Sequence, residues 1–203
     1  MQSATANIGL RWMTTADEFL KAAETLAHGD TEGHRRRAES TAYYAAFHCV
    51  IEAGVLLIFN EPEAQRRART WFEHSAMKTV AAAFSNAPQR PSDGSNDDVM
   101  ARFYERLTAW RQQVKKYDLQ NPPSADVQKL AGIFVALQRR RHAADYFAPV
   151  GEPQSVPRTT ALQKVKDARR FCKLVSECES QSDGDFVQLV SEMMRASVKS
   201  PRQ

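Results

Sequence analysis

The sequence predicts an all-α fold, an up-and-down helical bundle, from three observations. The chain has 203 residues but only 8 glycines and 9 prolines, fewer turn-forming residues than a β-sandwich or barrel requires. Apolar residues recur at helical spacing in several long segments, and no segment alternates convincingly with a period of two. We expect a single domain with about five core helices over residues 15–178, followed by a C-terminal helix and tail over residues 179–203.

The first part of the chain contains three predicted helices. The first runs from Thr15, which acts as an N-cap with Glu18 three residues later, to Ala27. The second covers residues 38–58, and its second half is apolar on almost every side, so we expect that half to be the most buried helical segment. A basic turn over residues 66–69 leads into the third helix, whose apolar residues are Trp71, Met77, Val80, Ala81 and Phe84.

Four more helices are predicted after a turn-rich loop over residues 85–96, three in the core and one at the C-terminus. The fourth predicted helix covers residues 97–116, with the apolar stripe Phe103, Leu107, Trp110 and Val114. The fifth begins after an N-cap at Ser124 and extends to Tyr146, and the sixth covers residues 159–178. A short terminal helix follows, with the apolar residues Phe186, Leu189, Val190 and Met193.

Composition limits the compartment and the cofactors. Three cysteines without a CxxC pair, all in helical patterns, encode neither a disulfide framework nor a zinc site, and no glycine-rich phosphate loop is present. We therefore expect no metal and no cofactor.

The N-terminus has no signal-peptide pattern, and the longest apolar stretch, residues 53–59, is too short to span a bilayer. These two observations predict a cytoplasmic protein without a membrane partner.

The fifth predicted helix breaks its own apolar pattern. Its stripe of four apolar residues continues at the same spacing onto Arg141. An ionised side chain directed at the core needs a partner, and Asp145 lies at the helical spacing that supplies one. One interpretation is an ion pair at the rim of the bundle, with solvated Arg139 and Arg140 beside it. The other is a polar cluster that binds phosphate, formed by Arg141, His142, Asp145 and Tyr146.

Histidines and aromatic residues elsewhere have simpler interpretations. Tyr43 and Phe47 on the second helix are expected to pack in the core, and His48 beside them remains open between a core histidine and a site residue. His74, together with the isolated His28 and His34, has the pattern of solvated surface rather than of a metal ligand.

Three stretches, taken in order, carry a family resemblance. Residues 40–48 are Ser-Thr-Ala-Tyr-Tyr-Ala-Ala-Phe-His, His74 then precedes Phe84 by ten residues, and residues 141–146 are Arg-His-Ala-Ala-Asp-Tyr. Over about residues 37–178 the chain resembles the HEPN (higher eukaryotes and prokaryotes nucleotide-binding) domain family, in its small prokaryotic toxin and defence branch. The resemblance implies a helical bundle, commonly a homodimer, in a toxin-antitoxin or phage-defence (antiviral defence) system with an antitoxin or other partner protein.

Many members of that family are metal-independent endoribonucleases, and the resemblance implies roles for the residues that match. Arg141 would hold the scissile phosphate, His142 would exchange protons, Asp145 would orient Arg141 or His142, and Tyr146 would donate to phosphate or accept a nucleotidyl group. Arg139 and Arg140 would be RNA-binding residues that attract further phosphates regardless of base sequence. The family's catalytic Arg-x4-6-His motif is not completed at His142. The alternative is therefore a catalytically inactive module for dimerisation or partner binding, whose apolar terminal helix over residues 186–194 is equally suited to pack on a partner or on its own bundle.

Overall fold

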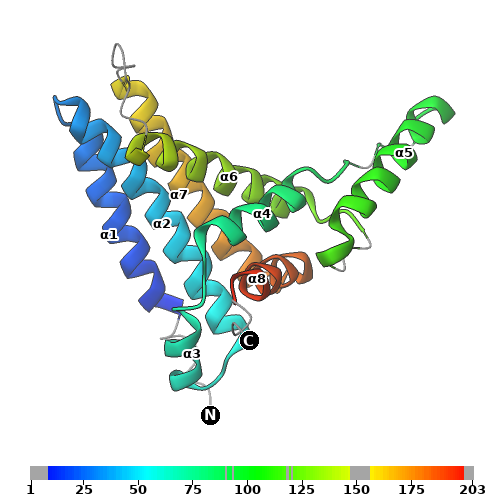
Figure 1. Ribbon diagram of the computed structural model, residues 1–203, viewed down its shortest axis with the longest axis horizontal. Helices are drawn as coiled ribbons and strands as arrows, with labels where there is room; N and C mark the ends of the chain where they lie inside the picture. The colour runs from blue at the N-terminus through cyan, green and yellow to red at the C-terminus, as the bar shows by residue number, and fades with distance from the viewer. Residues whose placement is uncertain are drawn as a thin grey trace.

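The computed structural model describes residues 9–89, 91–92, 94–117, 119, 121–146 and 156–198, with backbone alone for residues 9–14. Within these residues the chain forms eight α-helices and one 3-10 turn and no strand, so the predicted all-α bundle is confirmed (Figure 1). The elements in order are α1 (Gly9–Ala27), α2 (Glu32–Ile58), α3 (Pro62–Ala68), α4 (His74–Ser85), α5 (Asp97–Val114), η1 (Lys115–Tyr117), α6 (Ala125–Tyr146), α7 (Arg158–Ser180) and α8 (Gly184–Ser197).

Helix α2 is the centre of the bundle. It packs against α1 and α7, is crossed by α6, and contacts α8 near its C-terminal end (Figure 1). Every turn from Ala38 to Val55 contains buried residues, although Thr41, Tyr44, His48 and Glu52 are only partly buried, whereas Leu57 and Ile58 are exposed. The prediction that the second half is the most buried helical segment is therefore wrong. The alanine-rich first half is buried because its small side chains let the neighbouring helices approach closely.

By length and composition α2 is also apolar enough to cross a membrane, and it is the one such helix among the described residues. Most of its apolar window is buried inside the protein, against the helices that surround it. The core helix of a globular bundle meets the same criteria of length and hydropathy.

The N-terminal helices differ from the predicted boundaries. Helix α1 already begins at Gly9, so Thr15 lies within it and does not cap it. Helix α2 begins earlier than expected because the hydroxyl of Thr31 accepts a hydrogen bond from the His34 backbone N–H at 3.2 Å and caps the helix there. The predicted basic turn is mostly helix α3, which starts with Pro62, a residue suited to the first helical position.

Helix α8 closes the bundle over α4 and the C-terminal part of α2. Its apolar residues Phe186, Leu189, Val190 and Met193 are completely buried in the same core as the other helices. Gly54 of α2 makes this contact possible, since a Cβ added there would lie 3.1 Å from Cβ of Val190. Of the two possibilities for this apolar face, packing on a partner or on its own bundle, the structure has the second.

Helix α5 extends away from the rest of the bundle (Figure 1). Its C-terminal half is anchored, because Leu107, Trp110 and Val114 are buried and the Trp110 indole N–H donates to the Ala83 carbonyl at 2.9 Å. Three residues of the predicted stripe are therefore confirmed as core. Tyr104, one turn earlier, is exposed.

Candidate functional site: an arginine among tyrosines and a histidine

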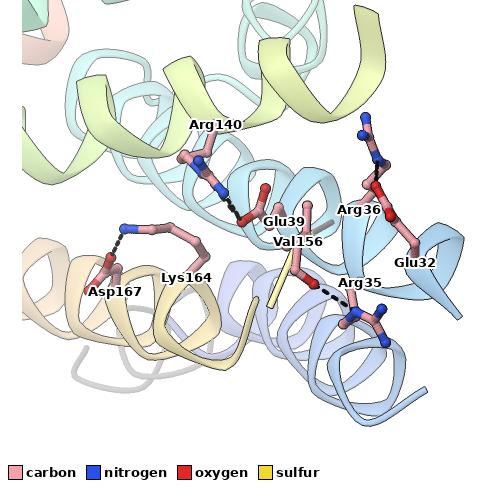
Figure 2. Close-up of polar contacts among 8 residues, drawn as sticks. All are labelled: Glu32, Arg35, Arg36, Glu39, Arg140, Val156, Lys164 and Asp167. Atoms are coloured by element: carbon pink, nitrogen blue, oxygen red, sulfur yellow. Dashed lines mark hydrogen bonds and ion pairs between the residues drawn. The ribbon is translucent and has the colours of Figure 1, made fainter. Parts of the chain in front are cut away.

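Two of the three arginine runs in the sequence meet at one end of the bundle. Residues 35–37 belong to the first turns of α2 and residues 139–141 to the last turns of α6. Arg140 reaches the Glu39 carboxylate at 2.8 Å, and the Ser40 hydroxyl donates to the Asp145 carboxylate at 3.2 Å. Figure 2 shows this end of the molecule, where Arg35 also donates to the Val156 carbonyl at 2.7 Å.

The core stripe of α6 leads to this end as the sequence predicts. Val127, Leu130, Phe134 and Leu137 are completely buried. Arg141 follows at the same spacing, with a side chain that is only 15% exposed. Its Nε lies 2.9 Å from the Asp145 carboxylate, so the predicted i,i+4 ion pair forms. The Nε–H is buried and not aligned on any hydrogen-bond acceptor, which makes this contact one of charge rather than a directed hydrogen bond.

Tyrosines surround the Arg141 guanidinium. Its central carbon lies 6.0, 5.6 and 5.5 Å from the ring centroids of Tyr43, Tyr44 and Tyr146. One terminal nitrogen donates to the Tyr44 hydroxyl at 3.2 Å. Burial acts to lower the pKa of Arg141, but Tyr44, Asp145 and Tyr146 outweigh it and the pKa lies above its ordinary value. The site therefore holds a permanent positive charge on aromatic faces, which favour cations.

His74 lies in the same cluster rather than on the solvated surface that the sequence predicts. Its Nδ1 is 2.6 Å from the Tyr43 hydroxyl, and its ring stacks on Phe47 with centroids 4.0 Å apart. The Gln138 side-chain amide donates to the His74 backbone carbonyl at 3.1 Å. Burial lowers the pKa of His74, and Arg141 and then His48 lower it further, so the imidazole is neutral at neutral pH.

The remaining predicted site residues are more open. Tyr146 is 64% exposed, and the His142 ring, also exposed, lies 5.0 Å from it. Arg139 is exposed and has no ion-pair partner among the described residues, whereas Arg140 is engaged by Glu39. His48 stacks on Phe19 of α1 with centroids 5.1 Å apart, which makes it part of the helix packing.

The sequence-based prediction missed His74 and Tyr44 as members of this cluster. Both contribute to the surroundings of Arg141, and Tyr43, expected only in the core, joins them through its hydroxyl. The available signal was the polar end of the α6 stripe, because a cation at a core position requires polar or aromatic neighbours on the facing helices.

No metal chemistry is apparent at this end of the bundle. In the described part of the chain no group of three or more His, Cys, Asp or Glu side chains is placed to hold a metal ion.

Comparisons of the chain with protein-family models, with curated proteins and with solved structures find no match. The chemistry of the site is that of a fixed guanidinium, tyrosine hydroxyls and two histidines.

Proposed function

We propose that this chain is an RNA-directed protein of the HEPN type, acting in a toxin-antitoxin or phage-defence system, and that Arg141 binds a phosphate of the RNA backbone. The observation that carries the proposal is the Arg141 guanidinium, which is kept charged and is held by three tyrosine rings at the basic end of the bundle. A guanidinium of fixed orientation is suited to phosphate because its donors match two oxygens at once.

The surroundings of Arg141 favour a long polyanion over a single anion. Arg37 and Arg139, on neighbouring helices, are exposed and have no ion-pair partner among the residues described here. Such charges attract phosphates without regard to base sequence, and they steer an extended backbone toward the more specific ligand. The exposed rings of Tyr146 and His142 offer faces on which an unpaired base can stack.

Metal-independent cleavage is the activity that the family resemblance adds to this binding. It requires a group that accepts the proton of the 2′-hydroxyl and a group that protonates the leaving oxygen. We assign both transfers to His142, because it is exposed and lies next to Arg141 in the chain. Its imidazole takes the proton of the 2′-hydroxyl and then gives that proton to the leaving oxygen. Tyr146 is 64% exposed, so a partner antitoxin can reach its side chain. The proposal includes two other partners: a second copy of the chain in a homodimer, and another protein of the defence system.

Binding is tested first, by fluorescence anisotropy with labelled single-stranded and hairpin RNA. Arg141→Ala is expected to weaken binding about tenfold, the loss typical of a charged hydrogen-bonded contact. Arg66→Ala is the matched control, because it removes the same charge from an exposed arginine of α3, at the opposite end of α2. Equal losses in the two variants, or a wild-type protein that binds neither RNA, would contradict the proposal.

Cleavage is tested on the same RNAs in the presence of EDTA. The expected products carry 2′,3′-cyclic phosphate and 5′-hydroxyl ends, and His142→Ala is expected to lower the rate about 100-fold, as for loss of an acid-base group. Growth arrest on expression, relieved by Arg141→Ala, is the corresponding result in cells. RNA binding through Arg141 without cleavage would leave the chain a non-catalytic RNA-binding or partner-binding HEPN module.

A further inference from the structure

The contact between Tyr43 and His74 leaves one imidazole nitrogen unused. Nδ1 of His74 lies 2.6 Å from the Tyr43 hydroxyl. Nε2 has no hydrogen-bond partner in the described part of the chain, and it is not among the enclosed polar atoms there, so it reaches solvent. Whether Nε2 carries a proton therefore decides whether His74 donates a hydrogen bond to a ligand or accepts one.

The proton on the Tyr43 hydroxyl fixes that state. Tyr43 is completely buried, and His74 is the one hydrogen-bond partner of its hydroxyl among the described residues. Burial raises the pKa of Tyr43 far above its ordinary value, so the hydroxyl keeps its proton. A buried O–H is satisfied only by donating, and Nδ1 is the available acceptor. A neutral imidazole that accepts at Nδ1 carries its own proton on Nε2.

The ring that presents this Nε2–H is held rigidly. Phe47 stacks on one face with centroids 4.0 Å apart, and Tyr44 meets the ring edge-on at 5.9 Å. Gln138 of α6 donates to the backbone carbonyl of His74, which fixes the start of α4 against α6. A donor held in this way loses little conformational entropy when it binds a ligand.

His74 and Arg141 flank the same two tyrosines. The His74 ring lies 5.5 and 5.9 Å from the rings of Tyr43 and Tyr44, and the Arg141 guanidinium lies 6.0 and 5.6 Å from them. The two side chains come from α4 and α6, which pack directly on each other. Arg141 supplies the charge of an anion site, and His74 supplies a neutral hydrogen-bond donor beside it.

We propose that His74 is a second phosphate ligand of the Arg141 site, donating from a neutral Nε2–H whose tautomer is set by Tyr43. The shared chemistry is that of phosphate oxygens, and the inference rests on the proposed function for RNA as their source. His74 in this tautomer is a binding donor and not a general base, because Nε2 has no free electron pair with which to accept a proton. Tyr43 is a positioning residue that acts through His74.

The tautomer is measured directly by ¹⁵N NMR of histidine-labelled protein. The expected spectrum of wild type assigns the proton of His74 to Nε2 and an unprotonated nitrogen to Nδ1. Titration with inorganic phosphate is expected to shift the Nε2–H resonance of His74, and titration with single-stranded RNA is expected to shift the same resonance. Tyr43→Phe is expected to mix the two tautomers, because Nδ1 then loses its donor.

Two substitutions of His74 separate its two nitrogens. The side-chain amide nitrogen of glutamine lies near the position of Nε2, whereas that of asparagine lies near Nδ1. His74→Asn is expected to weaken RNA binding about five- to tenfold, and His74→Gln about threefold or less, because only glutamine keeps the donor. His48→Gln is the matched control: it removes another half-buried histidine from the same aromatic cluster and is expected to leave the affinity unchanged.

Each outcome has one meaning. A proton on Nδ1 of His74, or a His74→Asn variant that binds RNA as wild type does while Arg141→Ala does not, would overturn this inference and leave the proposed function standing. A His74 resonance that responds to inorganic phosphate in a protein that does not bind RNA would support the phosphate site and overturn the proposed function. Equal losses in His74→Asn, His74→Gln and His48→Gln would assign His74 to packing alone and overturn the inference.

Discussion

Arg140 and Arg141 are neighbours in sequence, and both pair with a carboxylate and contact side chains of α2, yet the two ion pairs differ in burial and in the helices that they join. One step along an α-helix turns the side chain by about 100°. Arg140 accordingly faces α2, where it meets Glu39 at 2.8 Å, a side chain that is 1% exposed. Arg141 faces the tyrosine cluster and pairs with Asp145 of its own helix, which is 24% exposed.

The difference shows which charge the fold itself requires. Glu39 is buried, and a buried carboxylate without a partner is strongly destabilising, so Arg140 is needed for folding. Asp145 is partly exposed and keeps the Ser40 hydroxyl as a donor, so loss of Arg141 leaves no fully buried unpaired carboxylate. Substitution of Arg141 is therefore expected to destabilise the fold less than substitution of Arg140 and to affect ligand binding more.

The largest expected effect is on stability at Arg140. Arg140→Ala is expected to lower the free energy of unfolding by about 3 kcal/mol, because it leaves the Glu39 carboxylate buried and unpaired. Arg141→Ala is expected to cost about 1.5 kcal/mol, because it removes the half-buried pair with Asp145 and the hydrogen bond to the Tyr44 hydroxyl. Urea denaturation followed by circular dichroism measures both. The double variant Glu39→Gln with Arg140→Ala is expected to recover part of the loss, and equal costs at the two arginines would break the comparison.

The salt dependence of RNA binding should separate the two arginines next. For single-stranded RNA each phosphate contact contributes about 0.7 to the slope of log affinity against log salt concentration. Arg141→Ala is expected to lower the slope by about that amount. Arg140→Gln, which keeps an amide near Glu39, is expected to leave the slope unchanged. A loss of slope in both variants would mean that Arg140 contacts phosphate in addition to Glu39.

A smaller effect is expected at the partner of Arg141. Asp145→Asn removes a negative charge beside the phosphate ligand, and RNA affinity is expected to rise about threefold through reduced repulsion. Anisotropy at low and moderate salt measures the change, which should shrink as salt screens the charges. A fall in affinity would instead assign Asp145 an indispensable orienting role.

The smallest expected effect is the dependence of binding on pH. The pKa of His74 lies below its ordinary value of 6.5, first because of burial and then because of Arg141 and His48, while Glu73 raises it. His74 therefore takes up a second proton only below pH 6.5. That proton binds at Nδ1 and places a second positive charge beside Arg141. RNA affinity of wild type is expected to rise about twofold between pH 7 and pH 5.5, whereas His74→Asn should give a flatter profile.

Protonation of His74 and His48 also changes the free energy of unfolding. Because the folded-state pKa of His74 and of His48 is lowered, the unfolded chain binds protons more readily below the ordinary histidine value. Stability is therefore expected to fall as pH drops below 6.5, and urea midpoints over this range should fall less in His48→Gln than in wild type.

Local patterns in the sequence predict the fold class and one half of the site. The α6 stripe and the Arg141–Asp145 pair depend on spacings of three and four residues within a single helix, which the sequence displays directly. Capping is equally local, yet Thr15, which has the residue type and spacing of an N-cap, lies inside α1, because that helix extends back to Gly9.

The other half of the site depends on contacts between segments distant in sequence. Tyr43 and His74 are 31 positions apart, and Glu39 and Arg140 are 101 apart. No periodicity within one helix reports which residues of another helix will face it, because that depends on crossing geometry and on the volumes of intervening side chains. For the same reason the sequence distinguishes Arg141 by its place on the apolar stripe but does not report that Arg140 meets Glu39 of α2.

The central position of α2 has a consequence for how the chain is made. The helix ends at Ile58, and α7, which covers one side of it, begins at Arg158, so 158 − 58 = 100 further residues must be synthesised first. At about 5 to 20 residues per second this takes roughly 5 to 20 s. During that time a helix apolar enough to enter a membrane is covered only by α1 and whatever of α3 to α6 has emerged. We expect ribosome-associated chaperones to bind α2 during this interval. Their removal should reduce the soluble yield of this chain more than substitutions at Arg141 do.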